Sequence, residues 1–397
     1  MSTAFPRIFS LSATLFLLTS GAVAQHDPGG ITGGGMIGGS TSRPTTKPAT
    51  KSTTKPATTT TRPKPRPTTP VVKRPTSTTY TADYYYYQGE SLYNAQKYRE
   101  ALDQYLKATE LDPSMYAALY RIGWIYNDLE DYESAVDPLK RVTSLQPRNA
   151  AAQFELAYAY KKLERYTEAL PIFQQTVRIE PNYPAAHYEI GWIYNEQKNY
   201  DAAIRSLKTA LSYRADYPEA HNELGYAFRN LGRYPEAISE YQQAIQLKPD
   251  MSLAHLGLGD VYYYNTKNYA EAAKAYKRGL ELRPDNVTAQ YNLGWCYNDL
   301  ERYSEAIEEL RKAVQLQPNY PEAHNELGYA LHQLGRYQLA VQQYQIAIQQ
   351  KTDYASAHYN LGMSFIALRN RQAALQQYRI LQRIDNERAT KLFNQIK

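Results

Sequence analysis

The chain has 397 residues, of which 43% are hydrophobic, 21% charged and 13% aromatic, and this apolar content excludes disorder along its whole length. The single cysteine, Cys296, cannot close an internal disulfide or supply a CxxC redox pair, so stability must come from packing. The net charge of +6 is divided unevenly. Residues 1–80 hold ten Lys and Arg against one acid, whereas residues 81–397 hold 35 against 38 acids, so the basicity belongs to the first segment.

Residues 1–24 have the pattern of a cleaved export signal. Arg7 precedes an apolar stretch that runs from Ile8 to Leu18, and the small residues Ala22 and Ala24 follow. This pattern predicts cleavage before Gln25. The apolar stretch is shorter than the about 20 residues of a membrane helix. We therefore expect an exported protein, periplasmic or extracellular, without an integral membrane span after cleavage; a retained anchor is the alternative.

The next two segments predict flexible chain. Residues 25–40 are rich in glycine, and residues 41–80 contain 15 Thr, eight Pro, nine Lys and Arg, and no acid. A segment of this composition cannot build a core and is typical of an extended, disordered linker. Two roles remain open for it: a spacer, or an electrostatic anchor to an anionic envelope polymer.

From residue 81 to 388 the chain repeats itself with a period of 34 residues. One step in this series is 35 residues long, and we expect residues 262–265 to lengthen a turn there. The repeats are marked by a small residue that follows an aliphatic one: Gly89, Gly123, Ala157, Gly191, Gly225, Gly259, Gly294, Gly328 and Gly362.

Each repeat predicts two short antiparallel helices. In the fifth repeat Leu224, Phe228 and Leu231 recur at helical spacing, Gly232 interrupts the pattern, and Pro249 ends the second helical run. The small residues allow the paired helices to approach closely, and tyrosines fill the space between neighbouring repeats. One such pair cannot cover its own apolar face, so the pairs must stack.

This pattern resembles the tetratricopeptide repeat (TPR) family, whose motif Trp-x-x-Leu-Gly-x-x-Tyr, then Ala-x-x-x-Phe, then Ala and Pro is matched in nine successive repeats over residues 82–388. The resemblance implies an all-α, right-handed superhelical solenoid of about nine helix-turn-helix units. In residues 389–397, Leu392, Phe393 and Ile396 share one face, which predicts a capping helix on the last repeat.

The resemblance further implies that the first helix of each repeat lines a concave face that holds an extended peptide or a partner's tail. We expect a non-catalytic protein–protein interaction scaffold, because large rings with a polar tip are common anchors of binding surfaces. Packing of the same rings on their neighbours is the competing interpretation. The predicted partner-binding residues are Trp124, Tyr158, Trp192, Tyr226, Trp295 and Tyr329, then Tyr120, Tyr188 and Tyr291, and the amides Asn127, Asn195 and Asn298.

Other functions fit the sequence less well than a scaffold does. The alternative is a cell-envelope structural tether or glycan-binding protein, anchored through the basic segment 41–80. An enzyme is not expected, because the sequence has no phosphate-binding loop, GxSxG elbow or HExxH motif. No cofactor is expected, and the export signal argues against nucleic acid as a partner.

Five of the seven histidines occupy one position of the repeat: His187, His221, His255, His324 and His358. Successive histidines belong to different repeats, about 10–20 Å apart, whereas zinc–nitrogen bonds are about 2 Å long. We therefore predict hydrogen-bonding residues between repeats, and no metal site.

Overall fold

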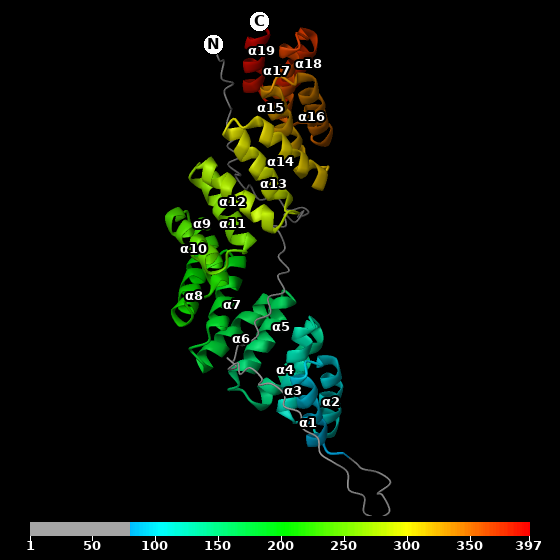
Figure 1. Cartoon of the computed structure of the whole chain (residues 1–397), viewed down its shortest axis with the longest axis vertical. Helices are drawn as coiled ribbons and strands as arrows, with labels where there is room; N and C mark the ends of the chain where they lie inside the picture. Colours follow the sequence, from blue (N-terminus) through cyan, green and yellow to red (C-terminus); the bar gives the residue numbers. More distant parts are fainter. Residues whose placement is uncertain (1–79) are drawn as a thin grey trace, which may run out of the picture. The chain divides into compact units, whose positions relative to one another are not determined.

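The computed structural model describes residues 80–397, so the predicted export signal, the glycine-rich segment and the linker up to residue 79 lie outside the described residues. Residues 80–397 are entirely helical, which confirms the predicted fold class (Figure 1). They form nine antiparallel helix pairs, and one further helix follows. None of these helices is long and apolar enough to cross a membrane.

The helices of the nine pairs have similar lengths. In chain order they are α1 (Ala82–Asn94) and α2 (Tyr98–Leu111), α3 (Tyr116–Asp128) and α4 (Tyr132–Leu145), α5 (Ala150–Lys162) and α6 (Tyr166–Ile179), α7 (Pro184–Glu196) and α8 (Tyr200–Tyr213), α9 (Pro218–Asn230) and α10 (Tyr234–Leu247), α11 (Ser252–Asp260) with its continuation η1 (Val261–Asn265) and α12 (Tyr269–Leu282), α13 (Val287–Asp299) and α14 (Tyr303–Leu316), α15 (Pro321–Gln333) and α16 (Tyr337–Gln350), and α17 (Ala355–Ala367) and α18 (Arg371–Ile384).

The turn inside a pair is tight, and its chemistry is visible in the sequence. In the turn that follows the first helix, a single residue adopts the left-handed conformation; examples are Glu130 (φ 60°) before α4 and Gly232 (φ 74°) before α10. A polar residue then caps several second helices; for example, the side chain of Asn199 accepts a hydrogen bond from the Ala202 N–H at the start of α8. These signals place the two helices of a pair side by side.

The small residue of each first helix marks the closest approach within the pair. A Cβ atom on Gly123 would lie 2.4 Å from Cγ of Leu139, which is fully buried. The tyrosines fill the space between repeats, as predicted. Tyr241 is 2% exposed, and its ring lies against Gly225 of its own repeat and Gly257 of the next.

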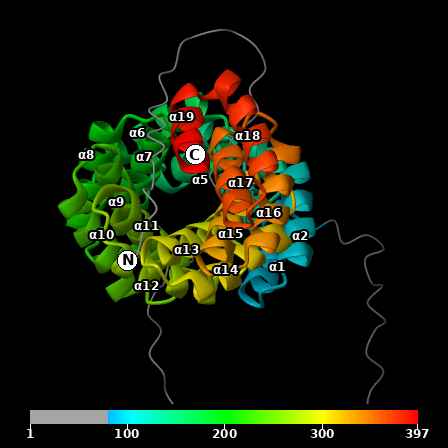
Figure 2. The ribbon, with the colours of Figure 1, turned by 90° about the horizontal axis from the view of Figure 1, so that it is seen from above.

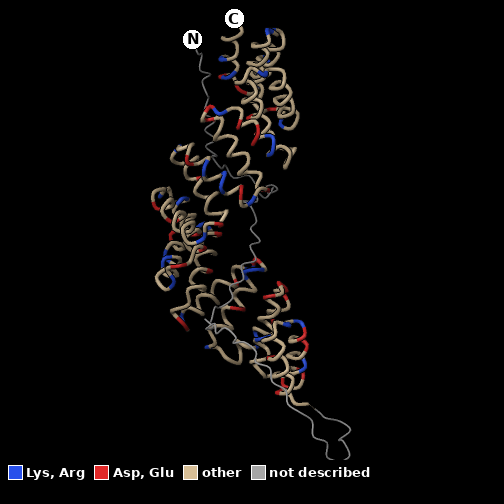
Figure 3. The backbone as a smooth tube through the Cα atoms, in the orientation of Figure 1, with Lys and Arg blue, Asp and Glu red and all other residues tan. Residues whose placement is uncertain are grey.

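The stacked pairs present their first helices to the inner side of the array. In Figure 2, α7, α13 and α17 lie nearer the centre than α8, α14 and α16. Both signs of charge are distributed along the array rather than gathered at one end (Figure 3). The first helices therefore form the inner surface of the array.

The longer sixth repeat corrects one sequence prediction. The extra residue does not lengthen a turn; it lies inside the first helix, where α11 continues as the π-helical segment η1. The Thr266 N–H donates to the Val261 carbonyl at 3.1 Å, which spans five residues instead of four. One widened turn thus absorbs the insertion without ending the helix.

The last helix, α19 (Asn386–Ile396), begins three residues before the predicted capping segment 389–397. The Asp385 carboxylate accepts a hydrogen bond from the Arg388 N–H at 2.9 Å and so caps its first turn. Leu392 is fully buried and lies against Gly362 of α17. Helix α19 therefore covers the inner helix of the last pair.

Candidate partner-binding surface

Six of the predicted residues form a row of rings on the inner helices, one per repeat, and all six are half-buried. We call these the inner aromatic row: Trp124 on α3, Tyr158 on α5, Trp192 on α7, Tyr226 on α9, Trp295 on α13 and Tyr329 on α15. Each ring therefore keeps part of its surface exposed to solvent and buries the rest.

A tyrosine from the preceding repeat fixes most of these rings. Tyr98, the first residue of α2, packs edge-on against Trp124 with ring centroids 5.8 Å apart, and Tyr166 packs in the same way against Trp192. The pairs Tyr132–Tyr158, Tyr200–Tyr226 and Tyr303–Tyr329 repeat this geometry at 6.2–6.3 Å. Such contacts contribute about 0.5–1.5 kcal/mol each beyond area burial. The rings thus pack neighbouring repeats together and also present partly exposed faces of fixed orientation.

These supporting tyrosines are not among the partner-binding residues predicted from the sequence, although their signal is visible there: a tyrosine recurs nine residues after most of the small residues. At Trp295 the tyrosine of the preceding repeat is Tyr263, which comes from η1 instead of the start of the second helix; the ring centroids are 5.3 Å apart, and that of Tyr291 on α13 lies at 5.5 Å. The second predicted row is less accessible. Tyr120 and Tyr188 are half-buried, and Tyr291 is only 7% exposed.

The three predicted asparagines do not lie open on the surface. Asn127, Asn195 and Asn298 are 7%, 2% and 0% exposed. Their amide nitrogens donate to a glutamate 28 residues later in the chain, both to its carboxylate and to its backbone carbonyl: Asn127 to Glu155 at 2.8 and 3.0 Å, Asn195 to Glu223 at 2.9 and 3.1 Å, and Asn298 to Glu326 at 3.2 Å each. They connect consecutive repeats.

The same relation of 28 residues recurs along the inner face, and we call these contacts the inner seam. Lys161 pairs with Glu189 at 2.6 Å, and the Tyr264 hydroxyl donates to Asn292 at 2.9 Å. Tyr264 comes into this register because η1 inserts one residue before it. The glutamates of the seam are functional candidates that are not among the residues predicted from the sequence.

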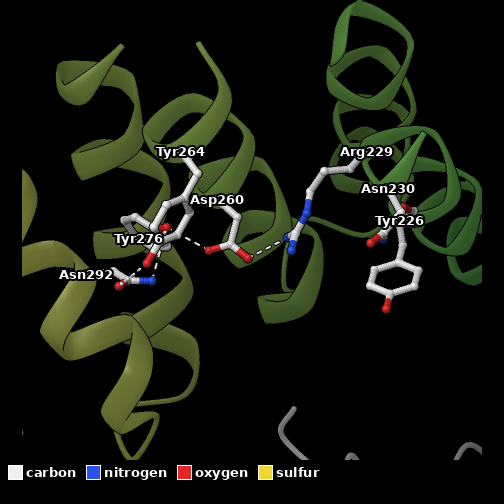
Figure 4. Close-up of polar contacts among 7 residues, drawn as sticks. All are labelled: Tyr226, Arg229, Asn230, Asp260, Tyr264, Tyr276 and Asn292. Carbon is white, nitrogen blue, oxygen red and sulfur yellow. Dashed lines mark hydrogen bonds and ion pairs between the residues drawn. The ribbon is translucent and has the colours of Figure 1, made fainter. Parts of the chain in front are cut away.

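Two junctions depart from this pattern. At one, His332 bonds to the Ser364 hydroxyl, 32 residues later, at 2.8 Å. At the other, the residue 28 positions after Arg229 is Gly257, which has no side chain to offer. Arg229 instead donates to Asp260 at 2.6 Å, and the Tyr276 hydroxyl donates to the other oxygen of that carboxylate at 2.7 Å (Figure 4). Asp260 occupies the position that the rings of the inner aromatic row occupy in other repeats. Here an ion pair takes the place of a ring.

Glu90 stands at the equivalent position of the first repeat. It accepts two hydrogen bonds from Arg121 at 2.8 and 3.0 Å, and one from the Tyr105 hydroxyl at 2.6 Å. Burial opposes the charge of Glu90, but the hydrogen bonds from Arg121 and Tyr105 hold its pKa below the usual value. The Glu90 carboxyl is therefore ionised, and its negative charge is balanced by Arg121 of the same chain.

Two of the glutamates that bind asparagines, Glu155 and Glu223, have a raised pKa instead of a lowered one. Burial raises the pKa of Glu155 to about 7, against the opposing effect of its hydrogen bond from Asn127. Burial also raises the pKa of Glu223. A neutral amide thus compensates these carboxylates less well than Arg121 compensates Glu90.

The five histidines hold the loops between repeats, which confirms the predicted hydrogen-bonding role. In each of them the ring Nε2 donates to the carbonyl of the residue six positions earlier, at 2.9–3.3 Å: Pro181, Ala215, Pro249, Pro318 and Thr352. Within residues 80–397, no group of His, Cys, Asp and Glu is arranged to hold a metal ion.

Comparison with known proteins places this geometry in context. Two family models described as Tetratricopeptide repeat match, one at residues 86–150, 128–184, 256–321, 299–355 and 326–389 and the other at 160–225, and a model described as TPR repeat matches residues 225–265. No curated protein matches the chain.

Several solved structures are similar. YrrB, described as a TPR protein with an unusual peptide-binding site, is 24% identical, with 47% of this chain and 97% of that chain covered and a TM-score of 0.45. PilF of Pseudomonas aeruginosa is 21% identical, with 53% and 96% covered and a TM-score of 0.45. The C-terminal part of a TPR repeat-containing protein from Cytophaga hutchinsonii is 17% identical, with 61% and 99% covered and a TM-score of 0.49.

Repeats of this kind suggest a protein–protein interaction scaffold, and such scaffolds are generally non-catalytic. The first of these family models matches residues within 86–184 and 256–389, more than half of the sequence. The chain belongs to the tetratricopeptide repeat family.

Proposed function

We propose that this protein is a non-catalytic scaffold that binds an extended peptide or partner segment along the inner aromatic row. The observation that carries the proposal is that each repeat of this row presents one half-buried ring, most of them fixed edge-on by a tyrosine of the preceding repeat. Rings held in this way lose little side-chain freedom on binding, which favours affinity.

An extended occupant fits this arrangement better than a compact ligand. The rings lie on the inner helices α3, α5, α7 and α9 and on α13 and α15, with Asp260 in place of a ring on α11, so a ligand that contacts several of them must run from repeat to repeat. Polyproline-like segments bind to aromatic faces with little loss of entropy, and tyrosine and tryptophan dominate the binding energy of many interfaces.

The test is capture of partners by the full chain from its own cell envelope. Replacing Trp124, Trp192 and Trp295 together by alanine should abolish capture while far-ultraviolet circular dichroism stays helical. Leu316→Ala is the matched control, because this side chain is 46% exposed at the end of the outer helix α14. Equal capture by the triple variant and the control would reject the inner aromatic row as the binding surface.

The proposal includes a place of action outside the cytoplasm, supported by the sequence of residues 1–24. Mass spectrometry of the protein purified from its host should find Gln25 at the N-terminus; an intact Met1 would contradict export with cleavage. The alternative function, an envelope tether or glycan binder, is favoured by the acid-free, basic composition of residues 41–80. Retention of cell-wall material by residues 25–80 alone would support that alternative.

A further inference from the structure

One junction of the inner seam carries its own cation. Lys161 is 12% exposed; its ammonium lies 2.6 Å from the carboxylate of Glu189 and 3.9 Å from the ring centroid of Trp192. Glu189 is only 2% exposed. An ammonium therefore fills the space between a carboxylate of the seam and a ring of the inner aromatic row, where it gains both an ion pair and a cation–π contact.

Three other junctions have the same carboxylate and ring, with an asparagine in place of Lys161: those at Asn127, Asn195 and Asn298. The first two carry the inference. At the first junction Asn127 stands in place of Lys161, with Glu155 28 residues later and Tyr158 31 residues later. At the second, Asn195 stands in that place, with Glu223 and Tyr226 at the same spacings. Glu155 and Glu223 are half-buried and so partly accessible, unlike Glu189. Among residues 80–397, neither is in an ion pair with Lys, Arg or His.

A second feature of these junctions points to a missing donor. The amide oxygens of Asn127 and Asn195 are buried and have no hydrogen-bond partner within residues 80–397. Their amide nitrogens are already used by the glutamates. Each junction therefore combines an uncompensated carboxylate with a buried acceptor, and buried acceptors without donors are rare in folded proteins.

The charges around the two glutamates do not compensate them. Burial is the main cause of both raised pKa values, and Asp128 raises that of Glu155 further; at Glu223, Lys161 lowers the pKa and Glu196 raises it by less, but burial outweighs the effect of Lys161. Lys162 lies 5.6 Å from the Tyr158 ring without pairing with Glu155 in the described part of the chain. Arg229, 6.0 Å from the Tyr226 ring, is paired with Asp260.

We propose that the partner segment is basic, and that its Lys or Arg side chains supply the cations absent beside Glu155 and Glu223, against the rings of Tyr158 and Tyr226. This inference rests on the proposed function and names the chemistry of its partner. Lys161 fills the junction between the two sites, so the segment presents its cations at alternate repeats. Net charge agrees, since residues 81–397 hold three more acids than bases.

The first experiment measures binding of a fluorescent peptide of alternating Lys and Pro to the full chain by fluorescence polarisation. Replacing both Glu155 and Glu223 by glutamine keeps an acceptor for the asparagines but removes the charge. Affinity should fall at least about tenfold, as expected for loss of charge-assisted hydrogen bonds. Glu308→Gln removes one charge from an exposed position of the outer helix α14 and should leave affinity unchanged.

The second experiment moves the built-in cation. Asn127→Lys should weaken binding of the same peptide, because the new ammonium occupies the site beside Glu155. Lys161→Asn should strengthen binding, because it opens an equivalent site beside Glu189. The two variants change charge in opposite directions, and circular dichroism and thermal melting verify that each is folded.

The outcomes separate this inference from the proposed function. If a peptide in which norleucine replaces every Lys binds as tightly, or if the glutamine variant and Asn127→Lys bind like the wild type, the inference is overturned. If the norleucine peptide then fails to bind the variant in which Trp124, Trp192 and Trp295 are alanine, the inner aromatic row would still stand as the binding surface. Absence of binding by any peptide also overturns the inference, while partner capture judges the proposed function separately.

Discussion

Replacing Glu155 by glutamine should stabilise the protein at neutral and alkaline pH. Burial raises the pKa of this carboxyl from an ordinary 4.5 to about 7, so the ionised form is disfavoured in the folded state. A difference of this size corresponds to roughly 3 kcal/mol at most, and partial exposure reduces it to about 1–3 kcal/mol. Glutamine keeps a carbonyl acceptor for the Asn127 amide, so the variant removes the charge and little else.

The pH dependence has a definite sign. Between pH 4.5 and about 7, folded Glu155 keeps a proton that the unfolded chain has lost, so wild-type stability falls as pH rises through this window. Above it the loss is complete. Glu223, whose pKa is also raised, adds a loss of the same sign.

Urea unfolding followed by circular dichroism, at about pH 5 and about pH 8, measures this effect. The gain of the Glu155→Gln variant over the wild type should be large at the higher pH and small at the lower one. Glu308→Gln, an exposed substitution of the same kind, should show no such difference. If Glu155→Gln has the same pH dependence as the wild type, the carboxyl is not held neutral by its surroundings and the reasoning fails.

Three further predictions concern the packing. Gly191→Ala should cost about 1–3 kcal/mol by thermal or urea unfolding, because the new Cβ would lie 2.6 Å from Leu207 Cγ, and an unchanged midpoint would contradict the close approach. Deleting residues 386–397 uncovers α17 and should lower the melting temperature and promote association, measured by light scattering; a melt identical to the wild type would show that α19 is not a cap. Cys296 is fully buried and burial raises its pKa, so Ellman's reagent should label it only after unfolding, and rapid labelling of the native protein would contradict its burial.

The helix pairs and their stacking could be predicted because single residues carry the signal. A glycine such as Gly123 recurs where two helices touch, and the array needs a small residue there at every repeat. The tyrosines between repeats follow from the same spacing, since Tyr241 must fit against Gly225 and Gly257. The capping helix was visible as an apolar face after the last repeat.

The functional surface could be predicted only in part. The inner helices and their rings follow from the period, but the direction of a short side chain depends on the offset between neighbouring helices. Asn127 therefore binds Glu155 of the next repeat instead of facing solvent. The constant separation of 28 residues between such partners is present in the sequence, yet it acquires meaning only once the stacking is known.

The π-helical turn in the sixth repeat has a consequence for how such arrays are compared. Counting 34 residues at a time from the earlier repeats would assign the contact with Asn292 to Tyr263, yet Tyr264 makes it. The widened turn shifts the repeat register by one residue in the middle of a helix, while the inner surface before and after it stays continuous. Alignments that place every length change in a loop will therefore misassign the inward-facing residues that follow the bulge.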